Sequence, residues 1–252
     1  MKKLINAGLI FLVVFGSLTF FLSIFGVDVM QKGNESEAAM WPGPVIYLPT
    51  LIYNAAPVKF THDFETGDLT GWTKTGTSFD FQPTFGDNPT ARARGQPSQH
   101  QGDWWIGCYE KFQNKKGEVA GAIQGDGPLG TLTSIEFKIV GDTINFLVGA
   151  GNHPWELPQP TCVNLEINGK MELTVAGKDT ETMIRHEWDV SDLKGKRAVI
   201  KVYDENSGGW GHPNCDDFWQ ADKNGKNISW DRLWAVDSFG KLPATFGEIK
   251  SK

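Results

Sequence analysis

The chain of 252 residues has few cysteines, few tyrosines and no excess of positive charge. Only three cysteines are present, so at most one intramolecular disulfide can form. Lysine and arginine number 24 against 30 aspartates and glutamates, which gives a net charge of −6. Such a chain offers no basic surface for a phosphate backbone, so we expect no nucleic acid among its partners.

Recognised catalytic motifs are also missing from the sequence. The histidines show no zinc spacing of the H-E-x-x-H type, and neither a G-x-S-x-G nucleophile motif nor a phosphate-binding glycine loop occurs. Carboxylates are plentiful, but none stands in a recognisable glycosidase context. We therefore predict that the protein is not an enzyme.

A sustained helical period is absent after Val27, and short strands separated by turn residues take its place. Apolar residues alternate with polar ones in the segment Ile135–Ile139, and Asn168-Gly169 is typical of a two-residue hairpin turn. The 29 glycines and 13 prolines suit the many tight turns of such a fold. This pattern predicts an all-β fold, a two-sheet antiparallel β-sandwich of the jelly-roll type, over residues 58–220.

The N-terminal segment predicts export. Lys2 and Lys3 precede an apolar run at residues 4–27 that is long enough to cross a membrane, so residues 1–27 are expected to be a signal anchor or a cleaved signal peptide. Everything after Val27 then lies outside the cytoplasm, either anchored to the membrane or secreted. Residues 28–57 are expected to be a tether followed by a proline-broken extended segment at 41–57, and residues 221–252 an extension docked on the sandwich.

Six motifs carry a resemblance to a known family. In chain order they are DFETGDLTGW at 63–72, GDNPTARARGQP at 86–97, HQGDWWIG at 100–107, GDGPLGTLTS at 125–134, WDVSDLKG at 188–195 and GGWGHPNCDD at 208–217. This series resembles the galactose-binding-like jelly-roll domain that accompanies secreted levanase and fructosidase glycosidases and occurs in other bacterial exported proteins. The chain departs from that pattern at Cys108 and Cys215, which form a disulfide or remain, with Cys162, as small buried thiols. The five-bladed catalytic domain that often accompanies such modules has no counterpart in the sequence.

The glycine-rich loop that ends at His212 presents a tryptophan and an imidazole of the kind that sugar recognition uses. With neighbouring polar and aromatic residues it gives a set of candidate ligand-binding side chains. They are Arg92, Arg94, His100, Trp104, Asp204, Trp210 and His212. The same side chains could instead be structural, with the arginines paired to carboxylates and Trp210 filling one end of the sandwich.

Acidic residues gather in the first and last motifs. Because the first and last strands of a jelly roll run side by side, we expect one carboxylate-rich edge, formed by Asp63, Glu65, Asp68, Asp216 and Asp217. Carboxylates so placed suit Ca²⁺, and sandwiches that resemble this one often hold a structural calcium there. The alternative is that these side chains cap turns through backbone N–H groups.

Two functions remain open from the sequence. The first is a non-catalytic carbohydrate-binding module displayed on the extracytoplasmic side of a membrane, with a glycan as its partner. The second is a structural or accessory subunit of a membrane complex or surface filament, in which the sandwich is a scaffold and residues 41–57 contact other protein subunits.

Overall fold

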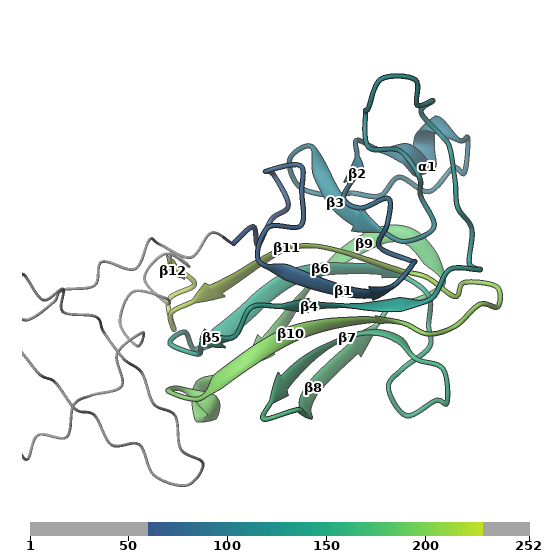
Figure 1. Cartoon of the computed structure of the whole chain (residues 1–252). Coiled ribbons are helices and arrows are strands. Elements are labelled where there is room, and N and C mark those ends of the chain that lie inside the picture. Colours follow the sequence, from purple (N-terminus) through teal and green to yellow (C-terminus); the bar gives the residue numbers. More distant parts are fainter. Residues whose placement is uncertain (1–59, 229–252) are drawn as a thin grey trace, which may run out of the picture. The chain divides into compact units, whose positions relative to one another are not determined.

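The computed structural model describes residues 60–228, which form two antiparallel sheets packed face to face (Figure 1). The first sheet has the order β1 (Trp72–Gly76), β4 (Gly130–Ser134), β10 (Arg197–Asp204), β7 (Thr161–Ile167) and β8 (Lys170–Ala176), with β5 (Phe137–Lys138) also paired to β10. The second has the order β2 (Thr84–Phe85), β3 (Trp104–Gly107), β11 (Pro213–Ala221), β6 (Thr143–Ala150) and β9 (Thr180–Asp189), with β12 (Asn227–Ile228) also paired to β11. The predicted all-β, two-sheet antiparallel sandwich is confirmed.

The main core lies between the two sheets and follows from the two-residue period of the strands. In β6, the side chains of Ile144, Phe146 and Val148 point to this core, where Phe146 stacks on Phe218 with ring centroids 5.3 Å apart. Leu147 points to the opposite face of the same strand, yet it is also buried. The outer face of the second sheet is therefore partly covered as well.

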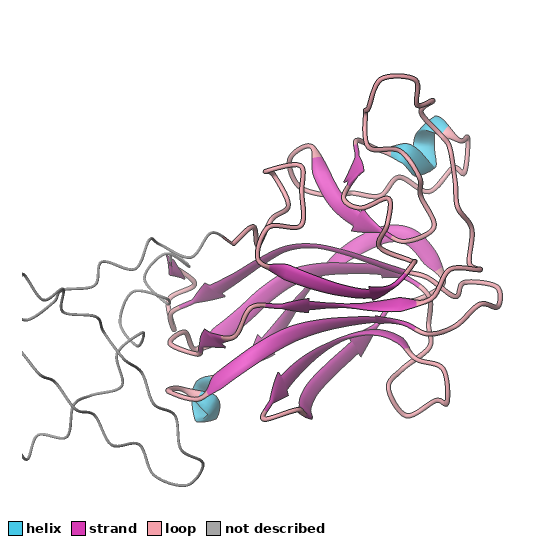
Figure 2. Ribbon diagram, in the orientation of Figure 1, coloured by secondary structure: helices cyan, strands magenta, loops and turns pink. Residues whose placement is uncertain are grey.

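A second small apolar cluster, made of Trp105, Leu147 and Met183, marks that covered outer face. The cover is the long segment from β2 to β3, which contains the one-turn helix α1 (Asn88–Ala91), and Figure 2 shows it as loop above the strands. Part of this segment follows the edge of β9. There, the Met183 N–H donates to Ser98 O at 2.9 Å, and the Thr182 hydroxyl donates to Pro97 O at 2.7 Å.

The predicted hairpin at Asn168-Gly169 is confirmed, because these two residues join β7 to β8 with φ values of 52° and 72°. Residues 60–64 form no strand: the chain turns at Phe64, whose φ is 58°, and the first strand begins at Trp72. That segment nevertheless lies beside β11 as expected, since the Phe218 N–H donates to His62 O at 3.0 Å.

Several sequence predictions fall on residues that the structure does not describe. They are the signal anchor or signal peptide at 1–27, the tether and extended segment at 28–57, and the part of the C-terminal extension beyond Ile228. Among residues 60–228, no helix has the length and apolar character needed to span a membrane. Cys108, Cys162 and Cys215 are all buried free thiols, so the proposed bridge is not formed.

Gly130 offers a test of the packing between β1 and β4. A Cβ atom at this position would lie 2.1 Å from the carbonyl oxygen of Thr75, which is backbone and cannot rotate away. We expect Gly130→Ala to lower the free energy of unfolding by about 1–3 kcal/mol through overpacking, as measured by urea denaturation. Gly127→Ala is the matched control, because no atom lies within 4 Å of its Cβ position, and it should leave stability nearly unchanged.

Candidate functional site

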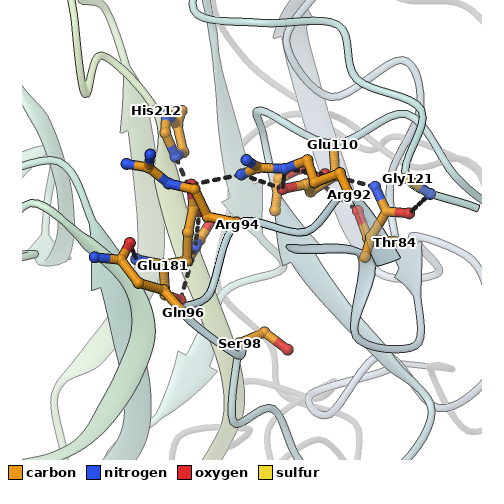
Figure 3. A network of polar contacts seen from close by, with 12 residues as sticks. Thr84, Arg92, Arg94, Gln96, Ser98, Glu110, Gly121, Glu181 and His212 are labelled. Carbon is orange, nitrogen blue, oxygen red and sulfur yellow. Dashed lines mark hydrogen bonds and ion pairs between the residues drawn. The ribbon is translucent and has the colours of Figure 1, made fainter. Parts of the chain in front are cut away.

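A buried cluster of charged side chains lies above the outer face of the second sheet, with Glu181 of β9 at its centre (Figure 3). The Arg92 guanidinium, just after α1, contacts Glu181 Oε1 at 2.5 Å and Glu110 Oε1 at 3.0 Å. On its other side Glu181 contacts Nε2 of His212 at 3.4 Å, and Nδ1 of His212 meets Asp126 at 2.6 Å. Four separate segments of the chain are thus joined through one carboxylate.

Burial and neighbouring charge act against each other on these groups. Burial alone would raise the pKa of Glu181, but its hydrogen bond and charge interaction with His212, together with Arg92, lower that pKa to about 2. Burial would lower the pKa of His212, whereas its hydrogen bonds to Asp126 and Glu181 raise it to about 9. At neutral pH, Glu181 is therefore an anion and His212 a cation.

Glu110 and Asn88 extend the cluster toward the surface loops. Glu110 is completely buried, and burial raises its pKa despite the hydrogen bonds from Arg92. The Asn88 amide donates to Glu110 Oε2 at 2.5 Å and to Ala122 O at 2.9 Å, so it ties α1 to the loop that follows β3. The network holds two long loops on the sheet.

Four of the predicted ligand-binding residues lie at this cluster, but each of them already contacts other protein groups. Arg92 and His212 are engaged with buried carboxylates, as described above. The ring of Trp210 stacks on His212 with centroids 5.8 Å apart, and the guanidinium of Arg94 lies 4.9 Å from the same ring. These contacts cover ring surface that the sequence analysis assigned to a sugar, and they match the structural alternative.

Two other predicted ligand-binding residues lie apart from the cluster. Asp204 is only 1% exposed and lies between the sheets, so a ligand at the surface cannot reach it, and its assignment to a sugar site is corrected. Trp104 packs edge-on against Phe85, with ring centroids 5.0 Å apart, and also lies against Gly67. Trp104 lies in a motif rich in turn residues, and this position suggested an exposed side chain. Trp104 and Trp105 point to opposite faces of β3, and on both faces the ring packs against other protein groups.

His100 is the predicted ligand-binding residue that does border a groove. The groove has a volume of about 640 Å³ and lies between the covering loop and the strands β6 and β9. Its lining consists of Gln99, His100, Gln101, Leu147, Met183, Ile184 and Arg185. Nδ1 of His100 is 2.7 Å from the Ser98 hydroxyl, and the imidazole ring stacks on Trp105 with centroids 5.8 Å apart.

Burial lowers the pKa of His100, although nearby carboxylates oppose the shift, so the ring is neutral at pH 7. Within residues 60–228, its Nε2 atom makes no hydrogen bond. A neutral imidazole that is held through Nδ1 can exchange one hydrogen bond with a ligand hydroxyl through this second nitrogen.

The five acidic residues predicted to bind metal are engaged by protein donors. Glu65 accepts from the backbone N–H groups of Asp103 and Trp104 at 3.0 and 2.9 Å. Asp216 accepts from the N–H groups of Gln101 at 2.8 Å and Asp217 at 2.7 Å, while Asp217 pairs with Arg185 at 2.6 Å.

The remaining two cap local turns. Asp63 accepts from Glu65 N at 3.3 Å, and Asp68 accepts from Thr70 N at 2.9 Å. In the described part of the chain, no group of three or more His, Cys, Asp or Glu side chains is arranged to hold a metal ion. Calcium at this edge stays a prediction, and the observed contacts are those of its turn-capping alternative.

Glu65 and Asp216 do lie close enough to interact electrostatically, as the predicted edge requires. Asp216 is fully buried, and burial raises its pKa to about 8, with a further contribution from Asp217 and Glu65. Its hydrogen bond to the Gln101 N–H fixes one wall of the groove. This acidic edge therefore adjoins the side of the groove formed by Gln101 and Arg185.

One protein named as a glycosyl hydrolase is similar to part of the chain. No protein-family model matches the chain. A protein of Aspergillus rugulosus, ecdE, which is named as a glycosyl hydrolase, is 39% identical over 121 residues. That match covers 48% of this chain, and the chain spans only 17% of the length of ecdE. The finding agrees with the predicted resemblance to a domain that accompanies glycosidases.

Two solved structures are similar to part of the chain. One is TmCBM61 in complex with β-1,4-galactotriose, at 13% identity and a TM-score of 0.38, covering 65% of this chain and 97% of that protein. The other is an exo-β-1,3-galactanase from Phanerochaete chrysosporium in complex with β-1,3-galactotriose, at 13% identity and a TM-score of 0.26, covering 60% of this chain and 29% of that one.

The prediction that the chain is not an enzyme is contradicted by the match to a protein named as a glycosyl hydrolase. The prediction rested on the absence of catalytic motifs with fixed spacing. Glycosidases work with two carboxyl groups that can come from distant parts of a sequence, so motif spacing alone does not exclude them.

Sequence reasoning missed the residues that organise the site. Glu181 was not singled out, although a carboxylate that alternates with Met183 along a strand signals a second buried face. The groove residues Gln99, Gln101 and Arg185 were missed because they come together only when the covering loop packs on β9.

The charge of His212 makes the stability of the fold depend on pH. Because the pKa of His212 is raised from 6.5 to about 9 on folding, its stabilising effect is complete below about pH 6.5 and is lost as pH rises through 9. We expect His212→Gln to lower the free energy of unfolding at pH 6 by on the order of 3 kcal/mol, and by much less at pH 10.

Urea denaturation of the wild type and the variant at both pH values measures this difference. The control is His186→Gln, a half-buried imidazole whose pKa is lowered by burial and by Lys178, so its effect should not change between pH 7 and pH 10. An equal effect of His212→Gln at both pH values would contradict a charged His212.

Proposed function

We propose that the domain binds a neutral glycan in the groove between the covering loop and strands β6 and β9. The observation that carries the proposal is the composition of the groove: Leu147, Met183 and Ile184 of β6 and β9 line it together with amide, imidazole and guanidinium groups. Ligand sites of this size commonly combine an apolar lining with a few placed polar groups.

The chemistry of a sugar suits this lining. A pyranose ring has one face rich in C–H groups, which can pack against the apolar part of the groove lining, and an equatorial rim of hydroxyls. Gln99, Gln101 and Nε2 of His100 supply both donors and acceptors for such hydroxyls. Gln99 is placed by a backbone turn with a φ of 53°, and Gln101 by its hydrogen bond to Asp216.

The charges around the groove support a neutral ligand. Arg185, the cation in the lining, is already paired with Asp217. Asp87, Glu65 and Asp103 lie near enough to His100 to act on its pKa. An acidic sugar would therefore meet net repulsion, whereas a neutral sugar would not.

Display outside the cell and attachment to a membrane belong to the same proposal. They are supported by Lys2 and Lys3 and by the apolar run at 4–27 in the sequence. The relative named as a glycosyl hydrolase suits a protein that acts on glycans, and its activity as a whole protein is a separate question, since the two chains share only part of their length.

The groove is tested by isothermal titration of the full-length protein with β-1,4-galactotriose and β-1,3-galactotriose, followed by a panel of neutral oligosaccharides. We expect Gln101→Ala to weaken binding of the best ligand about tenfold, because it removes side-chain hydrogen bonds worth about 1–1.5 kcal/mol. His100→Ala should weaken binding by a similar factor through loss of its hydrogen bond.

The matched control is Gln159→Ala. Gln101 and Gln159 are both exposed, but Gln159 lies outside the groove lining. Equal loss of binding in both glutamine variants, or binding of uronic acid oligomers as tightly as neutral ones, would show that the groove is not the neutral-glycan site. The same mixtures, assayed for released sugars, report any hydrolysis.

A further inference from the structure

The interior end of the sandwich around Asp204 has a different chemistry from the rest of the core. Asp204 is the last residue of β10, and its Cα partners are Gly130 of β4 and Thr161 of β7. Directly opposed residues share one face of a sheet, and this face is the inner one, since Val202 and Leu132, two residues away, belong to the main core. The Asp204 carboxyl therefore points between the sheets.

Four buried oxygen atoms near this point have no hydrogen-bond partner within residues 60–228. They are Oδ1 of Asp204, Oγ1 of Thr161, Oγ of Ser78 and Oε1 of Gln124. Buried polar atoms are almost always paired in folded proteins, so four such atoms in one neighbourhood need an explanation.

The contacts of these residues bring them together. Thr161 lies directly across the strand pair from Asp204, and Gly130 on the other side has no side chain to fill the space. The Ser78 hydroxyl lies 3.2 Å from the position that a Cβ of Gly130 would take. The Gln124 amide nitrogen donates to the carbonyl oxygens of Ser78 at 2.7 Å and Cys108 at 2.5 Å, which leaves its amide oxygen as the unpaired atom.

The nature of the atoms indicates what would satisfy them. A carboxylate oxygen and an amide oxygen only accept, and two hydroxyl oxygens can also act as ligands, so all four suit a hard cation. One carboxylate with three neutral oxygens balances a single positive charge. His212 and Asp126 also act on Asp204, with opposite signs.

We propose that Asp204, Thr161, Ser78 and Gln124 bind one monovalent hard cation such as Na⁺ between the two sheets. The ion would join β10 and β7 to the loops that contain Ser78 and Gln124, at the end of the sandwich where the long loops begin. It is distinct from the acidic edge of Glu65 and Asp216 and from the glycan groove.

The experiment follows thermal unfolding of the full-length protein in NaCl and in choline chloride at equal total chloride, after dialysis against choline chloride. A cation bound only to the folded state raises Tm as its concentration increases, whereas choline is too large for the site and controls for ionic strength. We expect a saturable rise in Tm with Na⁺.

Two variants localise the effect. Asp204→Asn should abolish the Na⁺ dependence, and Thr161→Val should weaken the apparent Na⁺ affinity about tenfold, equivalent to about 1.4 kcal/mol. If Thr161 were merely an unpaired hydroxyl, its replacement by valine would leave stability unchanged or improve it in both salts. Thr161→Val also guards against the case in which Asp204→Asn does not fold.

Thr174→Val is the matched control, because the Thr174 hydroxyl is likewise buried without a partner in the described residues but belongs to β8. It should keep the full Na⁺ response. Identical unfolding of the wild type in NaCl and choline chloride, or an unchanged apparent Na⁺ affinity in Thr161→Val, would overturn the proposal. Glycan binding is measured separately in each salt, so either proposal can fail without the other.

Discussion

A buried carboxylate on the outer face of a sheet is the constraint on which this structure depends. Glu181 lies where a sandwich strand normally presents its side chains to water, and leaving its charge unpaired there would cost several kcal/mol. Arg92 and His212 satisfy that charge from two different loops. The long loops of the domain are therefore held at fixed positions on the second sheet by the need to neutralise one side chain.

The same constraint shapes the groove. Because Arg92 fixes the start of the covering loop, the segment from Gln96 to Gln101 follows β9 and reaches the acidic edge at Asp216. The loop buries Trp105, Leu147 and Met183, and the groove lies along the line where the loop meets β6 and β9. The ion pairs of Glu181 thus determine where the groove lies, because they fix the path of the covering loop.

The sequence predicted elements whose signals are local. The Asn168-Gly169 turn places a hairpin where the structure has it, because the turn depends on neighbouring residues only. The identity of the site could be predicted less well. Trp210 and Asp204 look like ligand-binding residues in the sequence, but contacts across the fold give the first ring protein neighbours and bury the second side chain. Glu181 and Arg185 look like ordinary surface residues of a strand until the loop is placed over them.

Pairing of the covering loop with β9 has a consequence for how the protein meets copies of itself. β9 is the last strand of its sheet, and an open strand edge can recruit a strand from another molecule and start aggregation. The Gln96 side chain accepts from the Glu181 N–H, and the carbonyl oxygen of Ser98 accepts from the Met183 N–H. Between them, the carbonyl oxygen of Pro97 accepts from the Thr182 hydroxyl, and Pro97 has no N–H group of its own. At high local density, this half of the edge remains closed to intermolecular β-pairing.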